Sequence, residues 1–416
     1  MRFDALKSPF YRRFWFGSIA SIGSTQLYFI AMAWLVFELT GSPLDLGMLG
    51  AATAIPTIIA TLVGGIVADR LNRRSIMMAT SLLATILLLI LCILDWSNMV
   101  KVWHVLIISA LLGLVQGFDF PSRASIFPSL ISSDQMMSAV ALNSILWQGT
   151  RMILPAFSGI LIALTDTGFV FFISACGFVA MLLVLRTIDV RYESTIDSRP
   201  WNEFIDGIRY VFRRRIFRTL ITLTFGLHFF ATSYIQIMPV FADLLGGGER
   251  GYGILVSITG IGSVLGTVLI SRFQESRRLG KIMLFSAFAA PLSLVGFSLF
   301  IGAGAASTSG FVIASLFIVV SSAFGSIFLV TSMTVLQLLV PEHYRGRVMG
   351  IHSITFSLIP LGGLFVGGLA ALFAAPIAVI ISCLIMLALV TWSITWHSEI
   401  RALNGRNLPA LSKSDS

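Results

Sequence analysis

Long apolar runs alternate with short polar and charged stretches along almost the whole chain. At 1.5 Å per residue, each run is long enough to cross a hydrocarbon core roughly 30 Å thick. The hydrophobic pattern predicts twelve helical spans, at residues 14–38, 44–68, 75–95, 102–120, 138–164, 166–188, 216–243, 251–271, 280–302, 310–339, 346–373 and 376–397. The expected fold class is therefore an all-α integral membrane protein.

Composition supports a membrane protein and excludes an ordinary soluble domain. Of 416 residues, 56% are hydrophobic and 11% are charged, whereas globular domains are about 25% charged. The first apolar run lacks a small-residue cleavage site, so we expect it to remain as the first span. Cys92, Cys176 and Cys383 stand far apart inside apolar segments, so we expect no metal site and no cofactor.

The net charge of +9 raises the possibility of a nucleic-acid partner, which the distribution of the charges argues against. With twelve spans, both termini and the even-numbered loops share one side, and 25 of the 28 lysines and arginines fall there. The other side has Lys101 and Arg250, and Arg151 lies inside the fifth span. By the positive-inside rule we expect both termini to be cytoplasmic, in a bacterial inner membrane, with the lipid bilayer as partner and no nucleic acid.

The two halves of the chain resemble each other. LISSDQMMSAVALNSI from Leu130 aligns without gaps with LVPEHYRGRVMGIHSI from Leu339, at an offset of 209 residues. The same offset pairs Ser144 with Ser353 and Gly159 with Gly368. A repeat of six spans implies two six-helix bundles related by an axis along the membrane normal, with a substrate site between them.

A polar segment with both charge signs separates the halves. Within it, Trp201, Phe204, Ile205 and Ile208 have the spacing of an amphipathic helix on the membrane surface. The expected organisation is an N-terminal bundle at 1–188, a cytoplasmic linker at 189–215, a C-terminal bundle at 216–400 and a cytoplasmic tail at 401–416.

A charged motif, GGIVADRLNRR at residues 64–74, lies between the second and third spans. It resembles the G-x-x-x-D-R-x-G-R-R signature of major facilitator superfamily transporters, with Asn72 in place of the last Gly. The matching residues are Gly65, Asp69, Arg70, Arg73 and Arg74. The motif, its position and the span count together imply the major facilitator fold over the whole chain.

Other stretches narrow the resemblance to one bacterial branch. YRRFWFGSIASIGS, ELTGSPLDLGMLGA, GFDFPSRASIFPSL, ALNSILWQGTRMILPAFSGILIA and PEHYRGRVMG resemble the branch that holds the enterobactin exporter and macrolide efflux proteins. The fifth span departs from the Gly-Pro-x-x-Gly-Gly pattern of drug/proton antiporters, since it has Leu154-Pro155 and a single Gly159.

Asp69 needs partners, because an unpaired charge buried by the surrounding protein costs several kcal/mol. The resemblance implies that Asp119, late in the fourth span, faces the motif arginines with Arg123 one turn further on. It also implies that Asp69 faces the start of the eleventh helix near Gly346, where free amide groups favour an anion. This gating motif would latch the outward-facing state. The alternative is that these residues are only cytoplasmic anchors. The matching loop of the second half has Ser271 where the aspartate would stand.

Polar side chains inside the spans are the candidates for a substrate cavity, since ionisable groups in membrane helices usually face the bundle interior. Arg151 lies too deep for easy snorkelling, so it either binds an anionic or catechol-bearing substrate or pairs with a carboxylate as a structural tie. The resemblance places Gln26, Asn143, Arg151, His228 and Tyr234 near the cavity. For each residue taken singly, an interhelical hydrogen bond is the alternative, as it is for Gln148, Gln236 and His352.

Proton coupling requires a group that titrates as access to it changes. No carboxylate lies at mid-depth, so the candidates are Glu38, Asp119 and His228. Glu38 and Asp243 also fit a plain role as helix caps at the outer surface.

The expected function is secondary active transport by a monomer. The chain has no Walker A loop, no G-x-S-x-G elbow and no H-E-x-x-H, so we expect no enzyme. We expect export of a small amphipathic compound, a siderophore or drug, by alternating access and proton antiport. The alternatives are uptake or facilitated movement of a metabolite or lipid-like solute, and a membrane ligand sensor that does not transport.

Overall fold

The described residues of a computed structural model are 4–70, 72–188, 206, 209–273, 278–304, 306–396, 401 and 403, without the side chains of 62–70, 342, 343, 345, 346 and 353. In this part of the chain the regular structure is helical and contains no strand. Twelve helices are long and apolar enough to cross a membrane. The predicted all-α fold with twelve membrane spans is confirmed.

The first six spans lie in one compact unit, here unit 1, which comprises the described residues of 1–198 together with Gly248–Ser257. Its helices are α1 (Pro9–Thr40), α2 (Pro43–Arg70), α3 (Arg73–Trp96), α4 (Val102–Ile126), α5 (Met136–Leu164) and α6 (Thr167–Arg186). Short 3₁₀ turns lie at Asp4–Lys7, Phe127–Leu130 and Ser133–Gln135. The side chains of Ser8, Asn72 and Asp166 cap α1, α3 and α6.

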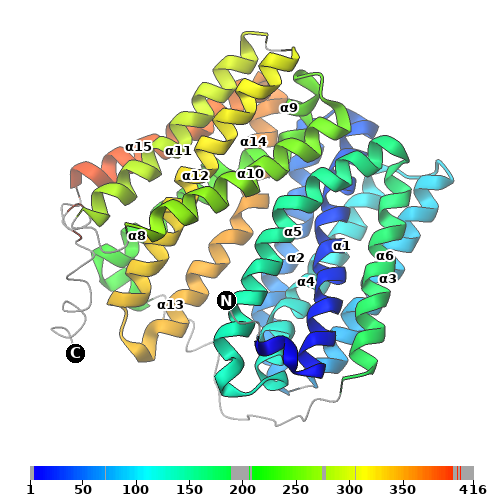
Figure 1. Cartoon of the computed structure of the whole chain (residues 1–416). Coiled ribbons are helices and arrows are strands. Elements are labelled where there is room, and N and C mark those ends of the chain that lie inside the picture. The colour runs from blue at the N-terminus through cyan, green and yellow to red at the C-terminus, as the bar shows by residue number, and fades with distance from the viewer. Residues whose placement is uncertain are drawn as a thin grey trace. The chain divides into compact units, whose positions relative to one another are not determined.

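Packing in unit 1 joins helices that are distant in sequence. The most extensive contact pairs α2 with α4, and α6 packs against both α1 and α3 (Figure 1). A core of buried side chains, including Tyr11, Phe14, Met77, Ala139 and Met181, fills the end of unit 1 where α1 and α3 begin. This core fixes the ends of the helices that hold the charged cluster described below.

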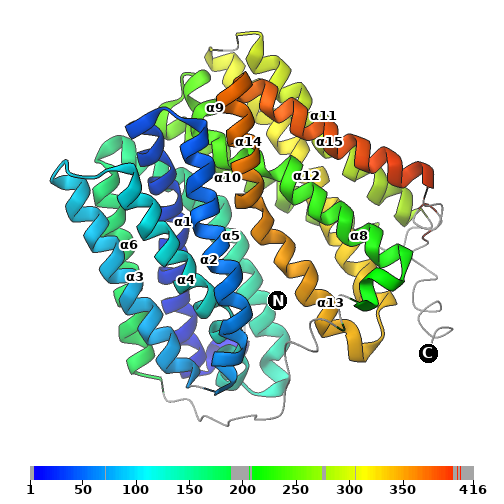
Figure 2. The same cartoon turned by 180° about the vertical axis from the view of Figure 1, so that it is seen from behind.

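The remaining spans lie mainly in unit 2, which comprises the described residues of 199–247 and 258–416. The seventh span consists of α8 (Arg215–Gly226), the π-helical η4 (Leu227–Ala231), the 3₁₀ helix η5 (Thr232–Ile237) and α9 (Met238–Leu244). Then follow α10 (Gly248–Ser271), α11 (Leu279–Gly302), α12 (Thr308–Leu339), α13 (Glu342–Ile354), the 3₁₀ turn η6 (Thr355–Ser357), α14 (Leu358–Phe373) and α15 (Ala375–Trp396). Within unit 2, α11 packs between α12 and α15 (Figure 2).

The seventh and eleventh spans, expected as continuous helices, are each interrupted. A proline follows each 3₁₀ segment, Pro239 after η5 and Pro360 after η6. Proline has no N–H to donate and its ring clashes with the carbonyl four residues earlier, which lies at Ile235 or Phe356. Each proline therefore removes one bond of the i→i−4 ladder next to a 3₁₀ segment.

The predicted division into bundles and linker stays a prediction. Residues 189–205, which hold the predicted linker and most of its amphipathic helix, lie outside the described residues, as does the tail beyond Leu403. The first ten residues of α10 group with unit 1 and the rest of α10 groups with unit 2.

Candidate functional site

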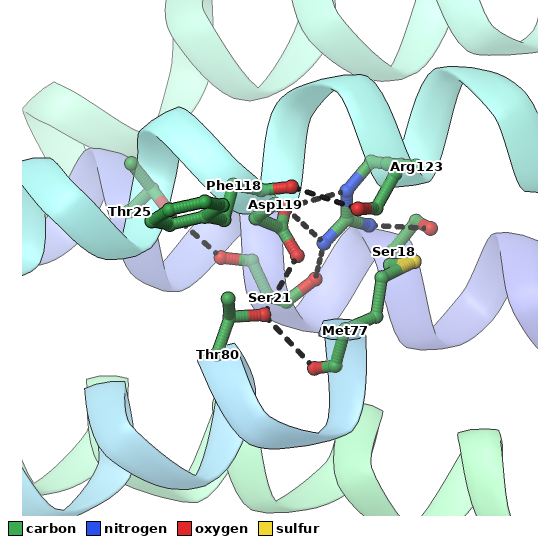
Figure 3. Close-up of polar contacts among 9 residues, drawn as sticks. Ser18, Ser21, Thr25, Met77, Thr80, Phe118, Asp119 and Arg123 are labelled. Carbon is green, nitrogen blue, oxygen red and sulfur yellow. Dashed lines mark hydrogen bonds and ion pairs between the residues drawn. The ribbon is translucent and has the colours of Figure 1, made fainter. Parts of the chain in front are cut away.

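A charged cluster lies on the cytoplasmic half of unit 1, by the predicted orientation. The Arg123 guanidinium donates from Nε to Oδ2 of Asp119 at 3.0 Å, and Nη2 lies 3.0 Å from the same oxygen. Nη1 donates to Oγ of Ser18 at 2.8 Å and Nη2 to Oγ of Ser21 at 3.1 Å (Figure 3). The Thr80 hydroxyl lies 3.4 Å from Oδ1 of Asp119. Three helices, α1, α3 and α4, thus converge on one ion pair.

Local helix geometry explains this arrangement. Asp119 and Arg123 are four residues apart on α4, the spacing at which helical side chains meet. Ser18 and Ser21 are three apart on α1 and present their hydroxyls on one face. The Arg123 side chain is only 8% exposed and that of Asp119 is 21% exposed. Removing one partner of such a buried pair costs about 3 to 5 kcal/mol, so the cluster stabilises the packing of α1, α3 and α4.

The motif arginines that the structure describes bind backbone carbonyls. Nη1 of Arg73 donates to the Ser125 carbonyl at 3.3 Å. Arg74 donates from Nε to the Leu185 carbonyl at 2.7 Å and from Nη2 to the Arg186 carbonyl at 3.1 Å. These bonds attach the start of α3 to the ends of α4 and α6.

The proposed latch itself lies outside the described side chains. The side chains of Asp69 and Arg70 and the surroundings of Gly65 and Gly346 are not among the described parts of the chain. The structure describes Asp119 with Arg123 and Thr80 as partners. The contact between Asp69 and the eleventh span therefore stays a prediction.

A polar face runs along α5 inside its apolar span. Ser144, Gln148 and Arg151 are exposed and follow the i, i+4, i+7 spacing of one helix face. Asn143 is half-buried beside them, and Gln26 is half-buried on α1, which packs against α5. Three of the five predicted cavity residues, Gln26, Asn143 and Arg151, therefore belong to unit 1.

The C-terminal half of α5 packs closely against the first residues of α10, which also belong to unit 1. A Cβ added at Gly159 would overlap the carbonyl oxygen of Glu249, and one added at Gly253 would overlap that of Pro155. The Ala156 amide donates to Oγ of Ser257 at 2.7 Å. Small residues allow membrane helices to approach in this way. The sequence showed both glycines but not which helices they bring together.

The other two predicted cavity residues are buried inside unit 2. Tyr234, in η5, is 4% exposed, and its ring centroid lies 6.2 Å from that of Phe297. His228, in η4, is 1% exposed, and its Nδ1 lies 3.1 Å from Oγ1 of Thr355. The same hydroxyl donates to the carbonyl of His352 at 2.6 Å. Their role in binding a substrate stays a prediction.

His228 and His352 both lie beside the ring of Phe356, a residue that the hydrophobic pattern did not single out. The ring of Phe356 lies 4.5 Å from that of His228 and 6.3 Å from that of His352. His352 is 2% exposed and Phe356 is 44% exposed. In the sequence, the H-S-I-T-F run at 352–356 was the available signal for this cluster.

The carboxylates at the outer helix ends have structural partners or are exposed. Oδ1 of Asp166 accepts from Nε1 of Trp96 at 2.9 Å, and Asp95 accepts from the Thr167 hydroxyl, which joins α3 to α6. Glu38 is exposed in the last turn of α1, whose C-terminal cap is Gly41, with its backbone N–H donating to the Phe37 carbonyl. Within the described residues, no group of three His, Cys, Asp or Glu side chains is placed to hold a metal ion.

Comparisons with known proteins agree on one family. The sequence profile described as "Transmembrane secretion effector" matches residues 2–413. The chain is 24% identical to the multidrug efflux pump Tap of Mycolicibacterium fortuitum, over 85% of this chain and 88% of that one. It is also 24% identical to an enterobactin exporter of Escherichia coli, over 89% and 87%.

The fold also matches a solved structure with little sequence identity. A bacterial homologue of the human lysosomal transporter Spinster superposes with a TM-score of 0.74 at 13% identity, over 95% of this chain and 98% of that one. At this identity the likeness concerns the fold alone, which is that of a major facilitator transporter.

Proposed function

Because the chain belongs to the transmembrane secretion effector family of the major facilitator superfamily, we propose that it exports a small amphipathic compound of the siderophore or drug type. The family resemblance predicted from the motifs is confirmed. The chain is a multi-pass membrane transporter by family and fold, and relatives over most of its length are named as an efflux pump and an exporter. The proposed location of the protein is a bacterial inner membrane.

The proposed orientation places both termini and the even-numbered loops in the cytoplasm. Support comes from the lysines and arginines, 25 of 28 of which fall on that side. In this orientation α5 begins at the cytoplasmic face and its polar face lies across the middle of the membrane. We propose that a monomer works by alternating access and without catalysis. The gating motif, with Gly65, Asp69, Arg70, Arg73, Arg74, Asp119 and Arg123, would control the change of state.

The single observation that carries the substrate proposal is the exposed polar face of α5. Arg151 lies 15 residues from Met136, which is about 22 Å along the helix axis. A charged side chain at such depth costs at least about 3 kcal/mol when it faces acyl chains. The face of Ser144, Gln148 and Arg151 is therefore a surface for water and solute rather than for lipid. Its cation favours a solute with a carboxylate or a catecholate.

Proton antiport is the proposed energy source, with Glu38, Asp119 and His228 as the predicted candidates. Asp119 forms an ion pair with Arg123 within α4. Glu38 is exposed at the end of α1. His228 is the candidate that is both buried and able to change charge near neutral pH.

Transport by purified protein in liposomes with an imposed pH gradient tests the function. The probes are dihydroxybenzoylserine, which has a carboxylate and a catechol, and the cation ethidium. We expect dihydroxybenzoylserine to move against its gradient when protons flow the opposite way. We expect Arg151→Gln to raise its KM about tenfold, the order of one charge-assisted contact, with Arg151→Lys intermediate. Gln148→Glu, which adds a negative charge one turn away from Arg151, should also weaken binding of the anionic dihydroxybenzoylserine.

Other outcomes separate the alternatives. Movement of both probes that is indifferent to the pH gradient would favour facilitated passage or uptake. Binding of a probe without flux would favour a ligand sensor. If Arg151→Gln changes neither KM nor binding of dihydroxybenzoylserine, the α5 face is not the binding surface for this anion.

A further inference from the structure

Two buried histidines meet at the helix breaks of unit 2, and we propose that His228, His352 and Thr355 form the protonation site that couples this transporter to the proton gradient. This inference rests on the proposed antiport and names the residues that would bind the transported proton. His228 lies in the π-helical η4 and His352 lies in the last turn of α13, directly before η6. Thr355 is the first residue of η6 and connects them.

The protons of this cluster can be counted from its geometry. Thr355 has one hydroxyl proton, which its 2.6 Å bond directs to the His352 carbonyl. At the 3.1 Å contact with His228, the hydroxyl oxygen must therefore accept, and Nδ1 of His228 must be the donor. Nδ1 is thus protonated in the neutral ring. The second proton, which turns the ring into an imidazolium, binds at Nε2.

His352 offers a second nitrogen for a proton. Its Nε2 is buried and has no hydrogen-bond partner among the described residues. Buried polar atoms are normally paired, and those that are not require an explanation such as a functional role. A neutral imidazole nitrogen that accepts a proton in one state of the transport cycle satisfies this requirement.

Few ionisable residues lie on the elements packed around the two rings. The elements packed on η4 and η6 are α8, α11, α13, α14, α15 and η5, and α12 packs on α13. On all of these elements except α13, the ionisable residues are Arg215, Arg218, Lys281, Tyr234 and Cys383. The first six positions of α13 add Glu342, His343, Tyr344, Arg345 and Arg347. Glu342 is the one carboxylate, and it stands ten residues before His352.

Phe356 contacts both rings and is itself 44% exposed. Its π face favours a neighbouring cation, so it supports an imidazolium once formed. Because Phe356 belongs to η6, a change of backbone at this break would alter access to the rings. A proton binds to an imidazole nitrogen from water on one side and leaves to water on the other, and only an N–H bond forms and breaks.

The experiment compares two modes of transport by variants in liposomes, with dihydroxybenzoylserine and ethidium as probes. Exchange at equal pH requires binding and alternating access but no net proton movement, whereas accumulation driven by a pH gradient requires coupling. We expect His228→Asn and His352→Asn to lower the ratio of gradient-driven accumulation to exchange by at least about tenfold. The control His104→Asn should leave this ratio unchanged.

The outcomes distinguish the histidine site from the antiport itself. If the wild type accumulates a probe and both histidine variants do so equally well, the histidine site is wrong and the proposed function stands. If the wild type shows no gradient-driven accumulation, the antiport is wrong. Should the variants fail to fold, the wild type decides: at a constant pH difference its rate of gradient-driven accumulation is expected to show a single titration between about pH 5 and 8, and a flat profile overturns the site.

Discussion

The charged cluster of unit 1 and the histidine cluster of unit 2 occupy a repeated scaffold but differ in chemistry. At the 209-residue offset of the repeat, Asp119 and Arg123 correspond to Phe328 and Ser332, both buried in α12. His352 corresponds to Asn143 on the polar face of α5. Unit 1 thus holds a paired carboxylate and guanidinium, and unit 2 holds two buried histidines that Thr355 connects. The difference separates a structural tie from a group that can change protonation.

The largest expected effect follows from breaking the ion pair of unit 1. Arg123→Met leaves Asp119 buried without its partner and should lower the free energy of unfolding by about 3 kcal/mol. Thermal unfolding in detergent measures this as a fall in Tm. The double variant Asp119→Leu with Arg123→Met should recover much of the loss, because it removes both buried charges.

The exposed pair of Lys7 and Asp4 provides the control for this prediction. Its ions lie 2.6 Å apart, but the side chains are 77% and 38% exposed. Solvent screens such a pair, so Lys7→Met should leave the Tm unchanged. A fall in Tm for Arg123→Met no greater than that for Lys7→Met would show that the cluster is not a structural tie.

A smaller effect is expected at glycines related by the repeat. A Cβ at Gly159 overlaps the backbone of α10, whereas one at its counterpart Gly368 meets nothing within 4 Å. Gly159→Ala should therefore destabilise unit 1 by about 2 kcal/mol through forced separation of the helices. Gly368→Ala should be neutral or slightly stabilising, because alanine favours a helix over glycine. Equal Tm values for the two variants would contradict the close packing of α5 on α10.

The smallest expected effect on stability concerns Thr355. Thr355→Val leaves Nδ1 of His228 without its acceptor and should cost about 1 kcal/mol. Thr331→Val is a matched control, because the buried Thr331 hydroxyl bonds the Ile327 carbonyl of its own helix. Of the two variants, only the one at 355 should shift the pH at which gradient-driven accumulation is half-maximal, since Thr355 contacts the His228 imidazole and Thr331 bonds its own helix. A shift of the same size for both variants would show that Thr355 takes no part in the titration.

The spans could be predicted from the sequence, because a helix that crosses a membrane needs a long apolar run and the apolar runs of this chain are long enough. The breaks in the seventh and eleventh spans could not. Pro56, Pro121, Pro155 and Pro291 all lie inside unbroken α-helices, whereas Pro239 and Pro360 follow 3₁₀ segments. Neighbouring helices decide which prolines interrupt a span, and the sequence does not say which helices are neighbours.

The candidate site could be predicted in part. The spacing of Asp119 and Arg123 signalled their pairing, but Ser18 and Ser21 come from α1, a hundred residues away in the chain. His228 and His352 were both visible as polar residues inside apolar spans. Their connection through Thr355 is a tertiary contact between residues 127 apart, which no local pattern encodes.

The most direct test of the central claim is the rate of deuterium exchange at the imidazole C2–H of each histidine, measured by mass spectrometry on protein in lipid nanodiscs between about pH 5 and 9. This rate reports the protonation of each ring separately, and His104 serves as the reference. The account predicts that His228 or His352 titrates within this range and that binding of dihydroxybenzoylserine shifts its titration. Two rings that stay neutral throughout, in protein that still transports against a pH gradient, would contradict it.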